Sequence, residues 1–349
     1  MKKQQSETKR SPIIDIMKCM GMICIVLGHY GFSSINAFVY TFHLPLFFCL
    51  SGYLMNTRSD LREFIGKKFR GLIWPYLAAC FLIILSAVCL NFIHEIVGSI
   101  SLQPASFLIK PIIYGAGNAV SVPFEINAIG AIWFLLALFW GSIMFRLLLK
   151  MPAFLCFLCI LMLTILSIVS YPHIQLPWSV QAAGASLPFM YVGYLYRHKR
   201  DELHLTHNTQ MGLMVVATGL WFWNIIYFNG FYLVRAYYGN GIMDFLGCFG
   251  GILWVYLLSK YIFNKYPKIS RFLSYFGRFS VMLLALHLVV DMWILTKPFI
   301  DVFNRISELS LFFSCFLFCV MDLFILFGVT YLVSKSKIGC CLFGIKDGI

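Results

Sequence analysis

Long apolar segments alternate with short polar segments along almost the whole chain. A helix needs about 20 mainly apolar residues to cross a lipid bilayer. Dividing the chain at its charge clusters and at its Pro, Gly and Asn groups predicts an all-α integral membrane protein with about ten transmembrane helices. The predicted spans cover residues 13–31, 36–55, 71–94, 128–149, 152–171, 181–197, 210–228, 240–263, 273–297 and 308–333.

The composition excludes the main alternatives to a membrane protein. Of 349 residues, 60% are hydrophobic and 12% are charged, whereas about 25% are charged in an average soluble domain. The apolar share is too high for a disordered chain, and the twelve cysteines are too thinly spread for a disulfide scaffold. We therefore expect one unit: a cytoplasmic segment over 1–12, a membrane domain over 13–333 and a cytoplasmic tail over 334–349.

The excess of positive charge predicts the orientation of the chain. The net charge is +13, and 22 of the 27 Lys and Arg residues fall in alternate loops and at the two termini. Cytoplasmic loops carry the excess of Lys and Arg in membrane proteins, so both termini are predicted to be cytoplasmic. We interpret this charge as an orientation signal and expect no nucleic-acid partner.

The first predicted span contains three residues that are costly in lipid: Asp15, Lys18 and His29. Eleven positions bring a helix back to nearly the same direction, so Lys18 and His29 share a face about 16 Å apart along the axis. This arrangement suits a long anionic cofactor that enters from the cytoplasm, with its phosphates near Lys18 and its reactive end near His29. The alternative is that Lys18 snorkels and pairs with Asp15, while His29 caps a helix interface.

The second predicted span offers His43 and Ser51 as candidate substrate-binding residues. His43 also fits an interior hydrogen-bonded histidine better than a metal ligand, because no carboxylate or second His stands at ligand spacing. Pro45 is expected to kink this span, and Gly52 is expected to allow close backbone approach. No metal site is predicted anywhere in the chain.

The ninth predicted span places Asp291 one helical turn after His287, on the same face. This pair is suited to orienting an imidazole or binding a polar substrate, and it equally fits an interior hydrogen bond. Asp244 and Asp322 also lie within spans, and the sequence assigns them no role.

A basic cluster of Lys67, Lys68 and Arg70 precedes the third predicted span. Clustered Lys and Arg side chains supply charge and hydrogen-bond donors to phosphoryl oxygens, so the cluster is a candidate phosphate site. The alternative is an anchor that only sets the membrane orientation.

Several of these motifs resemble the membrane-bound acyltransferase-3 family. The resemblance rests on Asp15-x-x-Lys18 with ten residues before His29, on Phe42-His43-Leu44-Pro45-Leu46-Phe47-Phe48, and on Ser51-Gly52-Tyr53-Leu54. It continues through Lys67-Lys68-x-Arg70 before Pro75-Tyr76, with weaker similarity at Trp133-Phe134-Leu135 and at Phe276-Gly277-Arg278-Phe279-Ser280 through His287. The chain departs from the family in having Lys18 where many members have Arg, and Lys lacks the planar fork of Arg.

The resemblance implies acetyl transfer from cytoplasmic acetyl-CoA to a sugar hydroxyl of a cell-envelope or exported glycan, in a bacterial inner membrane. It implies that His29 is catalytic, either as a general base or as an acyl carrier. The further candidates are Asp15, Lys18 and His287 as catalytic support, Lys18, Lys67, Lys68 and Arg70 for the cofactor, and His43, Ser51, Trp133 and Asp291 for the substrate. The expected partners are a glycan or lipid-linked sugar and membrane lipids. A homodimer is a further possible assembly.

A secondary transporter or exporter of a lipid-linked sugar or small anion is the competing hypothesis. Ten spans with ionisable residues inside them fit it too. Such transporters often have paired halves with broken helices at corresponding positions. The sequence has no such symmetry, because its polar residues concentrate in the first two spans.

Overall fold

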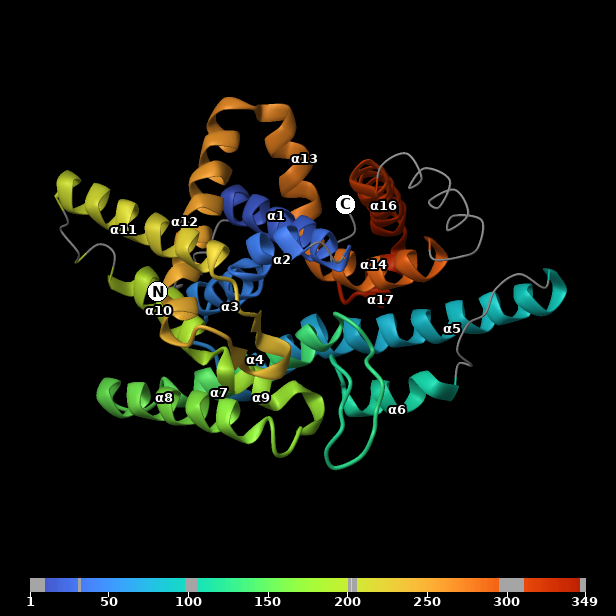
Figure 1. The fold of residues 1–349 in the computed structure, drawn as a ribbon, viewed down its shortest axis with the longest axis horizontal. Coiled ribbons are helices and arrows are strands. Elements are labelled where there is room, and N and C mark those ends of the chain that lie inside the picture. The colour runs from blue at the N-terminus through green and yellow to red at the C-terminus, as the bar shows by residue number, and fades with distance from the viewer. Residues whose placement is uncertain are drawn as a thin grey trace, which may run out of the picture.

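The computed structural model describes residues 10–30, 33–97, 106–199, 202, 206–294 and 311–345. Figure 1 shows that these residues form helices packed side by side, with one short two-stranded hairpin as the sole sheet among them. The prediction of an all-α membrane protein is confirmed.

Seven helical segments in the described part of the chain are long and apolar enough to cross a membrane, and a bent helix pair makes an eighth. The two remaining predicted spans correspond to a shorter apolar helix, α7, and to the consecutive helices α9 and α10. The uninterrupted helices among the predicted spans are α1 (Pro12–His29), α5 (Trp74–Val97), α7 (Trp133–Leu148), α8 (Ala153–Ser170), α11 (His207–Ile226), α12 (Ile242–Lys265) and α16 (Leu311–Lys335).

The second predicted span consists of two helices, α2 (Ser33–Tyr40) and α3 (His43–Tyr53). The break lies at residues 41–42, before Pro45. Pro45 is tolerated in the first turn of α3, because backbone N–H groups there have no partner within the helix. Likewise, α9 (Val180–Ala185) and α10 (Leu187–Lys199) meet at Ser186 within the sixth predicted span.

The third predicted span begins earlier than expected. Helix α4 (Leu61–Lys68) runs through a π-helical segment, Phe69–Ile73, directly into α5. Arg70 lies within the π-helical segment, a type of irregularity that is frequent at functional sites.

The ninth predicted span, 273–297, is wrong as one straight helix. It is divided between α13 (Pro267–Arg278) and α14 (Ser280–Ile294), which bend by 78° at Phe279. Helix α13 carries the exposed side chains of Lys268, Arg271 and Arg278, and charged side chains are costly in lipid. Residues 295–297 lie outside the described residues.

The connections and the predicted tail contain further short elements. Helix α6 (Ser106–Tyr114) lies in the connection between α5 and α7, and strands β1 (Phe231–Tyr232) and β2 (Tyr237–Tyr238) form the antiparallel hairpin between α11 and α12. Helix α17 (Lys337–Leu342) lies in the predicted tail, where the Trp74 indole N–H donates to the Cys341 carbonyl at 3.2 Å.

Helix α1 lies in the middle of the bundle and packs against α3, α12, α13 and α14 (Figure 1). Gly277 of α13 meets α1 so closely that a Cβ atom there would overlap the Asp15 carbonyl oxygen. Helices α3 and α10 approach in the same manner, because a Cβ at Gly52 would overlap the Met190 carbonyl oxygen and one at Gly193 would overlap the Cys49 carbonyl oxygen. The close approach expected at Gly52 is therefore confirmed.

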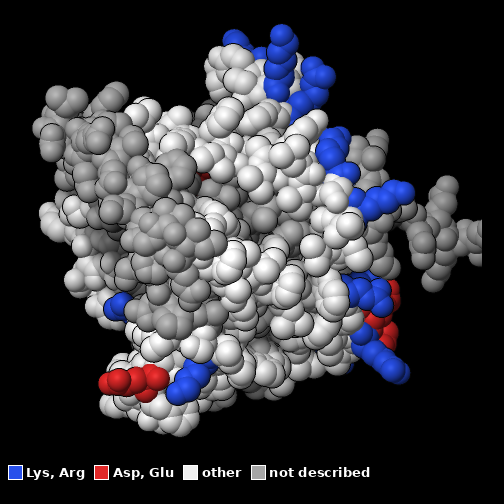
Figure 2. Space-filling model, turned by 90° about the vertical axis from the view of Figure 1, so that its right-hand side faces the viewer, with Lys and Arg blue, Asp and Glu red and all other residues white. Residues whose placement is uncertain are grey.

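Among the described residues on the face shown in Figure 2, the charged side chains lie mainly at the edges. Many large hydrophobic side chains on α8, α11 and α12 are exposed, among them Phe154, Val215 and Trp254. Exposed apolar helix surfaces of this extent are expected where lipid surrounds the protein.

Candidate functional site

A pair of histidines forms the centre of the candidate site. His29 is the last residue of α1 and is exposed, whereas His287 of α14 is fully buried. Their ring centroids lie 5.2 Å apart, with the ring planes inclined by 48°. The structure thus brings together two candidates that are 258 positions apart in the sequence.

His43, at the start of α3, joins this pair. It lies within electrostatic range of His29, and its ring packs edge-on against Tyr40 with the centroids 5.1 Å apart. The Tyr40 hydroxyl donates to the Gly28 carbonyl at 3.3 Å, which ties the end of α1 to α2. Tyr40 is a residue that the sequence analysis missed.

Backbone carbonyls fix the tautomers of the two buried imidazoles. His43 Nδ1 lies 2.6 Å from the Val39 carbonyl oxygen, and His287 Nδ1 lies 2.5 Å from that of Leu284. A carbonyl can only accept, so each Nδ1 carries the hydrogen and each Nε2 keeps a free lone pair. His287 Nε2 is buried and has no hydrogen-bond partner among the described residues. His43 is thus an interior hydrogen-bonded histidine, whereas the hydrogen bond described for His287 goes to a backbone carbonyl of its own helix rather than to Asp291.

Asp291 lies one turn beyond His287 on α14 and within electrostatic range of Asp322 on α16. The Tyr30 hydroxyl, in the residue that follows His29, lies 3.2 Å from Asp322 Oδ2. Asp322 was noted as an intramembrane acid without a role, and Tyr30 was missed. No periodicity along α16 places Asp322 near α1, so only the three-dimensional packing reveals this contact.

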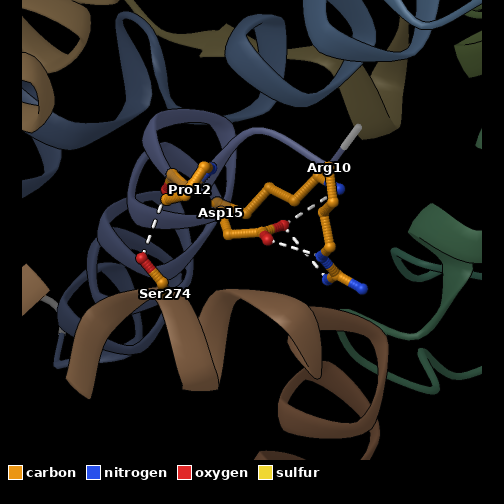
Figure 3. A network of polar contacts seen from close by, with 5 residues as sticks. Arg10, Pro12, Asp15 and Ser274 are labelled. Carbon is orange, nitrogen blue, oxygen red and sulfur yellow. Dashed lines mark hydrogen bonds and ion pairs between the residues drawn. The ribbon is translucent and has the colours of Figure 1, made fainter. Parts of the chain in front are cut away.

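The opposite end of α1 carries positive charge. Figure 3 shows the guanidinium of Arg10 against the carboxylate of Asp15, with Nε–Oδ2 and Nη2–Oδ1 distances of 2.6 and 3.1 Å. In the same view the Ser274 hydroxyl donates to the Pro12 carbonyl, which joins α13 to α1. Lys18 Nζ stands 3.9 Å from Asp15 Oδ1, a much looser contact than that of Arg10.

The basic cluster before α5 is divided by the structure. Lys68 lies within electrostatic range of Lys18, and its ammonium is 5.6 Å from the Phe64 ring centroid. Lys67 is exposed and paired with Glu63 at 2.6 Å, and Arg70 is exposed. Of the three predicted phosphate ligands, Lys68 is therefore the one with an electrostatic interaction with Lys18 among the described residues.

Ser51 and Trp133 lie in helix contacts. Ser51 Oγ is 3.4 Å from Ser142 Oγ of α7, and the buried Trp133 packs against Phe134 and over Gly117. Within the described ranges, neither makes a hydrogen bond or ring contact with the three histidines.

The histidines do not form a metal site of the usual kind within the part of the chain that the structure describes. There, no group of three or more His, Cys, Asp or Glu side chains has a geometry that could hold a metal ion.

The helices and these residues define a multi-pass membrane protein with an imidazole group at one end of a central helix and a cationic group at the other. The chain belongs to the acyltransferase-3 family, whose acyltransferase domain matches residues 12–330. This match confirms the family resemblance and identifies the protein as an acyltransferase. Comparisons with curated proteins and with solved structures found no significant match.

Proposed function

We propose that this protein transfers an acetyl group from cytoplasmic acetyl-CoA to a hydroxyl of a cell-envelope or exported glycan, in a bacterial inner membrane. The observation that carries the proposal is the continuity of α1 from Pro12 to His29. One straight helix holds Lys18 and His29 on the same face, about 16 Å apart along its axis.

The cationic end of α1 supports an anionic donor. Arg10 engages both oxygens of the Asp15 carboxylate, Lys18 stands 3.9 Å from one of them, and Lys68 lies within electrostatic range of Lys18. In these contacts three cationic side chains therefore face a single carboxylate, and the two ammonium groups repel each other. Phosphate groups of a coenzyme would relieve this repulsion and accept charge-assisted hydrogen bonds.

The imidazole end supplies the chemistry. His29 Nε2 or Nδ1 takes the proton of the sugar hydroxyl while the hydroxyl oxygen attacks the thioester carbonyl. The C–S bond then breaks, the proton passes to the sulfur, and the products are the sugar ester and CoA. His287 of α14 supports His29, because its neutral Nε2 is a hydrogen-bond acceptor next to the His29 ring. A two-step route through acyl-His29 uses the same geometry.

Binding of acetyl-CoA separates this proposal from the transporter hypothesis. We expect saturating acetyl-CoA to raise the Tm of the purified protein, because a ligand that binds only the folded state stabilises it in proportion to RT ln(1 + [L]/Kd). At 100 times Kd the gain is about 2.7 kcal/mol. An unchanged Tm contradicts the proposal and favours the transporter. A rise in Tm that ATP or free phosphate produces equally well also contradicts it, because the effect is then not specific to acetyl-CoA.

The two ammonium groups at the cationic end provide a second test. Lys18→Gln and Lys68→Gln are each expected to raise the acetyl-CoA concentration for half-maximal transfer about tenfold, the equivalent of about 1.4 kcal/mol. Lys67→Gln is the matched control, because Lys67 is exposed and paired with Glu63. Equal effects of all three substitutions would reduce the basic cluster to an orientation signal.

A further inference from the structure

A second polar cluster adjoins the histidine pair and takes no part in the mechanism described above. It consists of Tyr30 at the end of α1, Asp291 of α14 and Asp322 of α16, and we call it the Tyr30 cluster. The Tyr30 hydroxyl lies 3.1 Å from the Phe318 carbonyl oxygen and 3.2 Å from Asp322 Oδ2. Its single hydrogen can serve only one of these acceptors at a time.

The buried carboxylate of Asp322 has fewer hydrogen-bond partners than its two oxygens can accept. The residue is 1% exposed, and Oδ1 has no hydrogen-bond partner among the described residues. A buried acceptor that lacks a partner costs about 1–3 kcal/mol, and a carboxylate costs more. The rest of α16 is strongly apolar, and the contact with Tyr30 leaves Oδ1 of this carboxylate unsatisfied in the part of the chain that the structure describes.

The Tyr30 cluster presents acceptors close to the reactive imidazole. Asp291 lies within electrostatic range of both Tyr30 and Asp322. The buried His287 Nε2, another acceptor without a partner among the described residues, is one turn before Asp291. Among these described groups, acceptors without a partner therefore outnumber the one hydroxyl donor, that of Tyr30.

The chemistry of the cluster fits a sugar better than a phosphate or an alkyl chain. A sugar ring carries several hydroxyl donors that can satisfy several acceptors at once. An anion would be repelled by the carboxylates, and an alkyl chain would leave them unpaired. The cationic group at the other end of α1 has the opposite charge. The end that would bind the acetyl donor is therefore separate from the end that would bind the acceptor sugar.

We propose that Tyr30 and Asp322 form the subsite for the acceptor sugar, in which Asp322 accepts a hydrogen bond from a hydroxyl next to the one that is acylated. This inference rests on the proposed function. A site built to hydrogen-bond a hydroxyl discriminates strongly against molecules that lack it. Asp322 thereby favours a polyol acceptor beside His29 over a simple alcohol.

The test uses the full chain reconstituted in lipid, radiolabelled acetyl-CoA, and a glycolipid extract of the host membranes as the acceptor probe. Asp322→Asn is expected to raise the amount of extract that gives half-maximal transfer at least about tenfold. The half-saturating acetyl-CoA concentration stays within about twofold of wild type. Tyr30→Phe, which removes only a hydroxyl, is also expected to raise the amount of extract that gives half-maximal transfer. This second variant tests the inference even if Asp322→Asn does not fold.

Asp244→Asn is the matched control. Asp244 is also 1% exposed within a predicted span, but it is bonded to Asn240, which joins the loop to α12. Its substitution leaves both half-saturating values of the folded protein unchanged.

Two results overturn the inference. In the first, Asp322→Asn and Tyr30→Phe leave the half-saturating amount of extract unchanged. In the second, they raise the half-saturating acetyl-CoA concentration as much as the half-saturating amount of extract. Failure of the proposed function has a different signature, because the wild-type protein then transfers no acetyl group to any fraction of the extract. In that case the acceptor subsite is rejected with it.

Discussion

Replacing His29 with alanine is expected to lower the rate of acetyl transfer by about 10²–10⁴-fold, the usual contribution of a positioned general base. His29 is exposed at the end of α1 and lies beside the buried His287, so its removal takes the proton acceptor away without opening the core. The rate is measured with purified protein and radiolabelled acetyl-CoA. The Tm of the variant is expected to stay close to that of wild type.

His207→Ala is the control for this experiment. His207 is the first residue of α11 and is exposed, like His29, but it lies in a different helix. Its removal leaves the transfer rate unchanged. Full activity in a folded His29→Ala variant would contradict the catalytic role of His29, whichever of the two chemical routes is used.

Replacing Gly52 with alanine is expected to give the largest loss of stability among single methyl additions in α3. The added Cβ would overlap the Met190 carbonyl oxygen of α10, and backbone atoms cannot move aside as a flexible side chain can. Overpacking of this kind costs about 1–3 kcal/mol, occasionally more. Thermal unfolding in detergent measures the effect as a lower Tm and a smaller folded fraction.

Gly219→Ala provides the comparison. Gly219 lies within α11, and a Cβ added there meets no atom within 4 Å. Alanine is favoured over glycine inside a helix by roughly 0.4–1 kcal/mol, so this variant is expected to be as stable as wild type or more so. Equal Tm values for Gly52→Ala and Gly219→Ala would show that α3 and α10 are further apart than described.

The helices could be predicted from the sequence because lipid imposes a minimum length and an apolar surface on each span. The breaks within spans could not. Residues 41–42 and Phe279 interrupt apolar runs that look continuous in composition. At Phe279 the reason is tertiary, because α13 turns to bring Gly277 against the backbone of α1 at Asp15.

Part of the candidate site could also be predicted. Lys18 and His29 share one helix, so helical geometry alone aligns them. The meeting of His29 with His287 depends on α1 packing against α14, and intrahelical periodicity carries no information about that contact. For the same reason the sequence did not predict the contact between Tyr30 and Asp322 or the electrostatic interaction of Lys68 with Lys18.

The most direct test of the central claim is mass spectrometry of the envelope glycans of cells that make this protein, of cells that lack it and of cells that make His29→Ala. The account predicts that one acetyl group is present on a glycan sugar in the first cells and missing in the other two. Glycans with the same acetylation in all three would contradict it.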